Sequence, residues 1–132
     1  MEQALRAVFD ELADAFSALD LMRFRALYTL PAQVVMEGGS IALTDEAAFE
    51  QFFQPLAARL RAAGFARSVY SDFVSRDLGP GLALASMLWR RLAADGRVIE
   101  TLGATYLLRQ TPDWRIATLI GHAPGRGIAP QA

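Results

Sequence analysis

The chain has 132 residues, of which 53% are hydrophobic and 20% charged, with a formal net charge of −1 and no cysteine. That length suits one domain, and a chain of this size can bury about two-thirds of its surface on folding, so its core needs no metal or disulfide cross-link. The absence of cysteine excludes a disulfide scaffold, a cysteine-based zinc site and a thiol nucleophile.

All basic residues are arginine, and acidic residues balance them along the chain. Because there is no basic cluster, we expect no nucleic-acid partner. The first residues include acids, and the longest apolar stretch, 81–89, is far shorter than the roughly 20 residues of a membrane helix. We therefore expect a cytoplasmic protein without membrane contact, and the lysine-free, arginine-rich composition suggests a bacterial source.

Two helices are predicted at the start of the chain. Asp20 is placed to cap a short second helix that runs through Tyr28 and ends before Pro31. The first helix covers residues 4–19, where apolar residues recur at helical spacing: Leu5, Val8, Phe9, Leu12, Phe16 and Leu19.

A short strand and a third helix follow. Residues 34–36 form an apolar run that predicts a strand, closed by a turn at Gly38-Gly39. Thr44 is in position to cap the third helix, which ends at Gly64. The apolar face of this helix consists of Phe49, Phe52, Phe53, Leu56 and Leu60.

From Arg67 onward the pattern changes to strands. Asp95-Gly96 between two apolar runs is typical of a two-residue hairpin turn. Helices followed by strands indicate an α+β domain with a mostly antiparallel sheet. The Gly- and Pro-rich residues 124–132 are expected to form a flexible tail. The predicted strands cover residues 67–78, 81–94, 97–110 and 114–123.

The Asp95-Gly96 turn also predicts which residues face one another across the hairpin. A two-residue turn at the preceding Gly79-Pro80 would bring Tyr70 and Asp72 onto the sheet face that carries Trp89, unless that loop shifts by one residue. The pairs predicted on this face are Arg91 with Glu100, Trp89 with Leu102, Met87 with Ala104, and Ala85 with Tyr106.

The two faces of the predicted sheet differ in character. One face is aromatic, whereas the other mixes aliphatic residues with Ser, Thr and Gly. Three short helices can cover only one face, and the other is too apolar for water. We therefore expect a homodimer formed through the sheet.

The order and lengths of these elements resemble the nuclear transport factor 2-like superfamily, which includes ketosteroid isomerase-like and SnoaL-like proteins. The resemblance covers residues 1–123 as a single domain. It rests on the helix ending at Asp20, the Ala26-Leu27-Tyr28 segment, the Gly-Gly turn, and the strands that end in residues 105–109 and 114–116. It implies a curved, mostly antiparallel sheet wrapped as a cone around three N-terminal helices. It also implies an apolar pocket at the wide end of the cone and a dimer through the sheet.

Two residues are candidates for proton transfer. His122, the only histidine, ends the last strand and could be a general base, or a strand-end histidine bonded to a loop. An odd loop length before Trp114 places His122 on the Trp89 face, and an even length places it on the other. Asp72 lies in a strand whose neighbours suggest partial burial, so it could be a carboxylate with a raised pKa, or an exposed strand acid.

The remaining candidates concern binding and stability. Arg91 opposite Glu100 favours a structural cross-strand ion pair over a catalytic role for the acid. A metal site needs more ligands than one histidine and scattered acids, and no phosphate loop is present, so we expect no metal and no cofactor. Aromatic residues and a methionine suit either a pocket wall or a simple core: Tyr28, Tyr70, Met87, Trp89 and Tyr106.

These observations predict a protein that binds a small apolar or aromatic molecule in a cone pocket. Members of the superfamily include isomerases, dehydratases, hydrolases, cyclases and non-catalytic binding proteins, so the fold alone does not select a reaction. If the protein is an enzyme, proton-transfer chemistry at Asp72 or His122 is expected. The alternative is a non-catalytic ligand-binding or dimeric association module.

Overall fold

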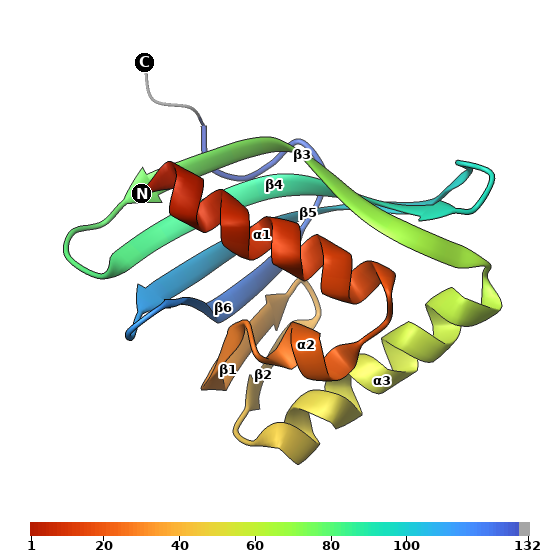
Figure 1. Ribbon diagram of the computed structural model, residues 1–132, viewed down its shortest axis with the longest axis horizontal. Helices are drawn as coiled ribbons and strands as arrows, with labels where there is room; N and C mark the ends of the chain where they lie inside the picture. Colours follow the sequence, from red (N-terminus) through yellow and green to blue (C-terminus); the bar gives the residue numbers. More distant parts are fainter. Residues whose placement is uncertain (130–132) are drawn as a thin grey trace.

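A computed structural model describes residues 1–129 as three helices packed on one face of a single curved sheet (Figure 1). The helices are α1 (Glu2–Ser17), α2 (Leu21–Arg25) and α3 (Glu46–Ala62). The six strands are β1 (Tyr28–Met36), β2 (Gly39–Leu43), β3 (Phe65–Asp77), β4 (Leu82–Ala93), β5 (Val98–Gln110) and β6 (Trp114–His122). Their order in the sheet is β2-β1-β6-β5-β4-β3. Within the described part of the chain, no helix is long and apolar enough to cross a membrane.

The α+β class and the mostly antiparallel sheet are confirmed, and the one parallel pair joins β1 to β6. The prediction around Tyr28 is wrong: α2 ends at Arg25, and Tyr28 already belongs to β1. Tyr28 pairs with Ile116 of β6, and the Ile116 N–H donates a hydrogen bond to the Leu27 carbonyl at 2.8 Å. Pairing with a distant strand thus overrides the local helical pattern.

The helix caps agree with the sequence prediction at one helix and differ at the next. Asp20 caps α2, as predicted, because its carboxylate accepts a hydrogen bond from Arg23 N at 3.2 Å. The cap of α3 is Asp45 rather than Thr44, and its carboxylate accepts from Ala48 N at 2.8 Å. A cap needs a non-helical residue whose side chain reaches a free N–H three positions on, and Asp45 occupies that place.

The register of the β4–β5 hairpin is confirmed from Leu82 to Arg91. Trp89 pairs with Leu102, and Arg91 pairs with Glu100, as predicted. Next to the turn the prediction is wrong: Leu92 pairs with Val98 instead of Ile99, and the Ala93 N–H donates to the Arg97 carbonyl at 2.9 Å, so a bulge at Ile99 restores the predicted register. In the neighbouring β3–β4 pair Tyr70 lies opposite Trp89, as predicted, whereas next to the turn the register is shifted by one residue and Asp77 pairs with Ala83. These pairings bring the side chains of three strands onto the face that the helices cover.

Two β-bulges then change which side chains face inward. In β3 the register shifts between Ser71 and Val74, and Asp72 adopts a positive φ of 58°. Phe73 takes the inward position and packs against Phe9, with ring centroids 5.9 Å apart. Asp72 is left exposed, so the expectation of partial burial is wrong.

The second bulge lies in β6, where Leu107 pairs with Thr118 but Leu108 pairs with Ile116. The loop before Trp114 has three residues, an odd number that by itself would place His122 on the Trp89 face. The extra residue in β6, Ala117, shifts the register by one position. His122 therefore pairs with Gly103 and lies on the opposite face.

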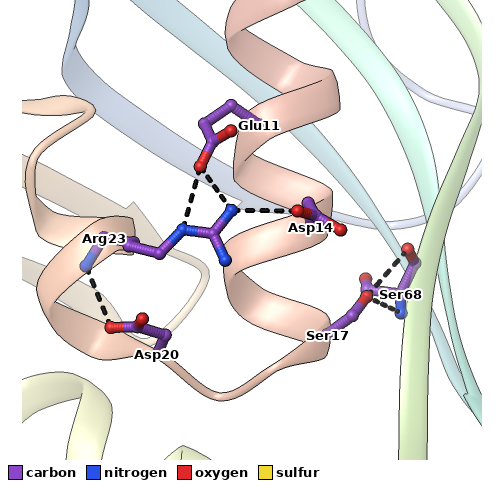
Figure 2. Close-up of polar contacts among 6 residues, drawn as sticks. All are labelled: Glu11, Asp14, Ser17, Asp20, Arg23 and Ser68. Atoms are coloured by element: carbon purple, nitrogen blue, oxygen red, sulfur yellow. Dashed lines mark hydrogen bonds and ion pairs between the residues drawn. The ribbon is translucent and has the colours of Figure 1, made fainter.

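Polar contacts fix the helices against each other and against the sheet (Figure 2). The guanidinium of Arg23 in α2 contacts Glu11 at 2.6 Å and Asp14 at 2.9 Å, both in α1. At the end of α1 the hydroxyl of Ser17 accepts a hydrogen bond from the N–H of Ser68 in β3 at 2.9 Å. These contacts hold α1 and α2 in place over the inner face of the sheet.

The tail turns back onto the outer face, away from the helices. The Ile128 N–H donates to the hydroxyl of Ser86 in β4 at 3.3 Å, and Arg76 of β3 donates to the Ala129 carbonyl at 2.8 Å. Residues 124–129, expected to be flexible, are thus hydrogen bonded to the sheet. Residues 130–132 of the predicted tail lie outside the described residues.

The caps generate a test of this local assignment. Asp45→Ala is expected to lower the free energy of unfolding by about 1 kcal/mol, because an N–H of the first turn of α3 loses its acceptor. Thr44→Ala is the matched control, since Thr44 is also exposed and its side chain does not cap the helix; it should cost less than about 0.5 kcal/mol. Equilibrium urea unfolding measures both. Equal losses would show that the cap is wrongly assigned.

Candidate functional site

A cavity of about 280 Å³ lies between the helices and the inner face of the sheet. The helices contribute Leu12, Phe16, Phe24, Phe52, Phe53, Leu56 and Arg59 to its wall. The sheet contributes Tyr28, Met36, Ser68, Trp89, Arg91, Glu100, Leu102, Tyr106, Leu119 and Gly121. The wall is therefore mostly apolar and aromatic, with a small number of polar groups.

Two of these polar groups are tyrosine hydroxyls. The indole Nε1–H of Trp89 donates a hydrogen bond to the Tyr106 hydroxyl at 2.9 Å. Because this hydroxyl already accepts, its own proton stays available, and it has no acceptor among residues 1–129. The hydroxyl of Tyr28 likewise makes no hydrogen bond within the described chain, although the residue is only 3% exposed. Both hydroxyls can donate to an acceptor placed in the cavity.

The wall also contains Ser68 and three charged side chains, and the charged side chains come from three elements. The Glu100 carboxylate lies between two arginines, with Oε2 2.6 Å from Arg91 Nη1 and Oε1 2.7 Å from Arg59 Nη1. The expected pair of Arg91 with Glu100 is thus present, and Arg59 of α3 joins it. The Arg91 side chain is 14% exposed, and its guanidinium lies 5.0 Å from the ring centre of Phe16. Arg59, at 57% exposure, lies at the rim.

Burial and charge act in opposite directions on this group. Partial burial raises the pKa of Glu100, but the hydrogen bond from Arg59 and the charge of Arg91 outweigh it and hold the pKa below its ordinary value. Burial lowers the pKa of Arg91, and Glu100 partly restores it. Arg91 and Glu100 are therefore both charged at neutral pH. Arginine keeps its proton even when buried, and the lowered pKa of Glu100 keeps its carboxylate ionised.

Three of the five residues considered for a pocket wall line the cavity: Tyr28, Trp89 and Tyr106. Met87 is buried in the core and is not part of the lining. Tyr70 packs edge-on against Trp89, with centroids 5.4 Å apart, and its hydroxyl donates to Asp10 at 2.6 Å. Its polar tip therefore points to the edge of α1 and not into the cavity.

Neither candidate for proton transfer lies at the cavity. Asp72 is exposed on its bulge. His122 is on the outer face, where Nε2 is 2.8 Å from the Thr105 hydroxyl and Nδ1 is 2.9 Å from the Ala123 carbonyl. Of the two roles that the sequence allowed for His122, these contacts match the second, a strand-end histidine that is hydrogen bonded to its surroundings. In the described residues, no three His, Asp or Glu side chains come together in a group that could hold a metal.

Arg59 is the charged residue that sequence reasoning missed. Phe52 and Leu56 had been placed on the apolar face of the third helix, and both line the cavity. Arg59 follows them at positions i+7 and i+3, so it continues the same stripe. A charge at the end of an apolar helical stripe was the available signal.

Three N-terminal helices over one face of a six-stranded curved sheet, with an aromatic cavity between the layers, define a cone-shaped α+β domain. Residues 2–124 match the family described as NTF2-like protein (DUF6841), and the chain belongs to this NTF2-like family. The resemblance inferred from the sequence is thereby confirmed. No curated protein matches the chain significantly.

Solved structures share this fold at low sequence identity. An NTF2-like protein with a cystatin-like fold from Novosphingobium aromaticivorans is 14% identical with a TM-score of 0.76, over 96% of this chain and 83% of that one. Aln2 from a Streptomyces species is 17% identical with a TM-score of 0.76, over 92% and 89%. A candidate aromatic ring hydroxylase from Novosphingobium aromaticivorans is 15% identical with a TM-score of 0.70, over 94% and 89%. At these identities the likeness shows the fold alone.

The tyrosines give a test of the cavity's environment. Burial raises the pKa of all three tyrosines of the chain, Tyr28, Tyr70 and Tyr106, and it raises the pKa of Tyr70 to about 12 with help from the hydrogen bond to Asp10. We therefore expect the native protein to show no tyrosine ionising at about pH 10, the ordinary value, whereas all three ionise there in urea. Phenolate absorbance during a pH titration measures both.

The same shifts fix the sign of the pH dependence of stability. Because the folded pKa values lie above the unfolded one, the stability contributed by the neutral phenols is complete below about pH 10 and is lost as the pH rises through the folded values. A native tyrosine that titrates normally would contradict the buried arrangement.

Proposed function

We propose that the protein binds a small apolar or aromatic molecule in the cavity between the helices and the sheet. The observation that carries the proposal is a space of about 280 Å³ inside a domain of only 132 residues. Protein interiors are close-packed, with few voids larger than a water molecule, and an empty cavity lowers stability. A space this large in so small a core is therefore better explained by a ligand than by imperfect packing.

The lining supports the same class of ligand. Ligand pockets are mostly apolar, with a few placed polar groups, and they span roughly 300–1,000 Å³, so this one lies near the lower limit. Aromatic rings from α1, α2, α3 and the sheet surround the space, which favours a flat apolar body. The free protons of Tyr28 and Tyr106 would orient an oxygen of that body. A structural neighbour described as a candidate aromatic ring hydroxylase is consistent with an aromatic ligand.

Binding, rather than proton transfer at Asp72 or His122, is the function this geometry supports best. Both residues lie outside the cavity lining, and their polar atoms face solvent or the outer side of the sheet. A general base must come within hydrogen-bond reach of the proton that it removes. We therefore assign these two residues no part in the proposed binding.

A neutral two-ring probe tests the proposal. Naphthalene-2-carboxamide is expected to bind at one site and to shift the indole Nε1–H signal of Trp89 in a nitrogen-15 NMR titration, because that group lines the cavity. The indole of Trp114, outside the lining, is the internal control. Absence of saturable binding, or a shift confined to Trp114, would refute the proposal.

A cavity-filling variant sharpens this test. Leu102→Trp should weaken binding by at least about tenfold, or about 1.4 kcal/mol, because the larger side chain occupies the space. Leu78→Trp, in the exposed loop between β3 and β4, is the matched control and should bind as the unmodified chain does. If Leu102→Trp lowers the melting temperature strongly, Leu102→Phe makes the same comparison with less overpacking.

We also propose a homodimer through the outer face of the sheet, on a separate observation. By register, Val69, Leu82 and Ile120 lie on the face away from the helices, and they are 37%, 38% and 36% exposed. They come from three strands of a face that also carries the tail at Ser86 and Arg76. Exposed apolar residues on a sheet face favour association with a second copy.

Ile120→Glu is expected to convert the dimer to a monomer, because a charge would be buried without a partner at the interface. Met22→Glu, a charge added on the exposed side of α2, is the matched control and should leave the dimer intact. Light scattering coupled to size-exclusion chromatography measures both masses. A monomeric wild-type protein at micromolar concentration would refute the dimer.

A further inference from the structure

The charged end of the cavity indicates what kind of molecule binds there. We infer that the ligand is an aromatic or apolar carboxylate whose negative charge is held by Arg91 in place of Glu100, which then stays paired with Arg59 alone. This inference rests on the proposed function, since it names the class of ligand for the same cavity.

The first argument is the balance of charge. The ionisable charges in the cavity wall are Arg59, Arg91 and Glu100, two positive and one negative. One carboxylate serves both guanidinium groups, giving one oxygen to each, at 2.7 Å and 2.6 Å. The wall therefore carries one uncompensated positive charge beside an apolar space, where charge interactions are stronger than in water. A ligand with a single negative charge would balance it.

The second argument is the unused donor capacity of Arg91. A guanidinium has five N–H donors arranged to bind a carboxylate through two parallel hydrogen bonds. Arg91 uses one of them, from Nη1 to Glu100. Its Nε–H is closed to solvent and has no acceptor anywhere in residues 1–129. A buried donor without a partner is costly, and a ligand carboxylate would reach this N–H once Glu100 has moved, since the N–H is closed to the cavity while Glu100 holds its place.

The third argument is that Glu100 is placed to be displaced. Its side chain is 27% exposed, and its second partner, Arg59, is 57% exposed at the rim, whereas Arg91 is 14% exposed. Glu100 can therefore turn outward with Arg59 while Arg91 stays in the wall. That movement would open Arg91 to a ligand carboxylate and leave Glu100 paired with Arg59, so that no charge loses its partner.

Other ligand charges fit this end less well. A cation would face the surplus positive charge of the two arginines. A neutral molecule would leave the surplus positive charge unbalanced. The guanidinium also lies over the Phe16 ring, at 5.0 Å from its centre, which keeps its plane fixed beside the apolar space. An aromatic body with a carboxylate at one end would contact the aromatic wall and the guanidinium together.

The test compares two probes of the same shape at pH 7, naphthalene-2-carboxylate and naphthalene-2-carboxamide, by isothermal titration calorimetry. The carboxylate is expected to bind about tenfold more tightly or better, as charge-assisted hydrogen bonds to a buried guanidinium are strong. Glu100→Gln should strengthen binding of the carboxylate further and leave the carboxamide unchanged, because it removes the internal competitor. Arg91→Met should abolish the preference for the carboxylate while the carboxamide still binds.

Glu50→Gln is the matched control, since Glu50 is an exposed acid of α3 outside the cavity lining and its loss changes the net charge equally. It should change neither affinity. If Arg91→Met does not fold, Glu100→Gln alone decides the question. Equal affinities for the two probes, or an equal gain for both in Glu100→Gln, would overturn the carboxylate inference and leave cavity binding intact. Failure of both probes to bind would overturn the inference and the proposed function together.

Discussion

The pairing of β4 with β5 is the constraint on which the rest of the site depends. The turn at Asp95-Gly96 and the bulge at Ile99 together set Trp89 opposite Leu102 and Arg91 opposite Glu100, so aromatic, apolar and charged groups share one face of the sheet. The period of two along a strand means that a slip of one residue would send all of them to the outer face. Contacts from α1 and α2 then hold the helices over that face, and the cavity is the space they leave.

The cavity combines two environments. The hydroxyls of Tyr28 and Tyr106 are buried among aromatic rings, and burial keeps their phenols neutral by raising their pKa. Glu100, in the same wall, stays ionised because two arginines outweigh the effect of its partial burial. An apolar space between neutral donors and a surplus positive charge is suited to a molecule with an aromatic body and an acidic end. Without a ligand, Glu100 remains hydrogen bonded to both Arg59 and Arg91.

Local patterns predicted the elements whose geometry is decided within a few residues. The Asp-Gly signal gave the β4–β5 register from Leu82 to Arg91, although a bulge at Ile99 displaces the pairs next to the turn, and the cap at Asp20 followed from its position before an apolar helical run. The bulges at Asp72 and Ala117 had no such signal, because a strand bulges where packing of its neighbours, here Phe73 on Phe9, outweighs regular pairing. The bulge in β3 leaves Asp72 exposed to solvent, and the bulge in β6 turns His122 to the outer face. Arg59 was missed for a different reason, since its contact with Glu100 joins residues far apart in sequence.

The most direct measurement is a crystal structure of the protein with naphthalene-2-carboxylate bound. The account predicts the rings between the helices and the sheet beside Trp89, with the carboxylate within hydrogen-bond distance of Arg91 and Glu100 turned toward Arg59. Rings bound outside the cavity would contradict the account. So would a carboxylate directed away from Arg91 while Glu100 keeps its contacts with both arginines.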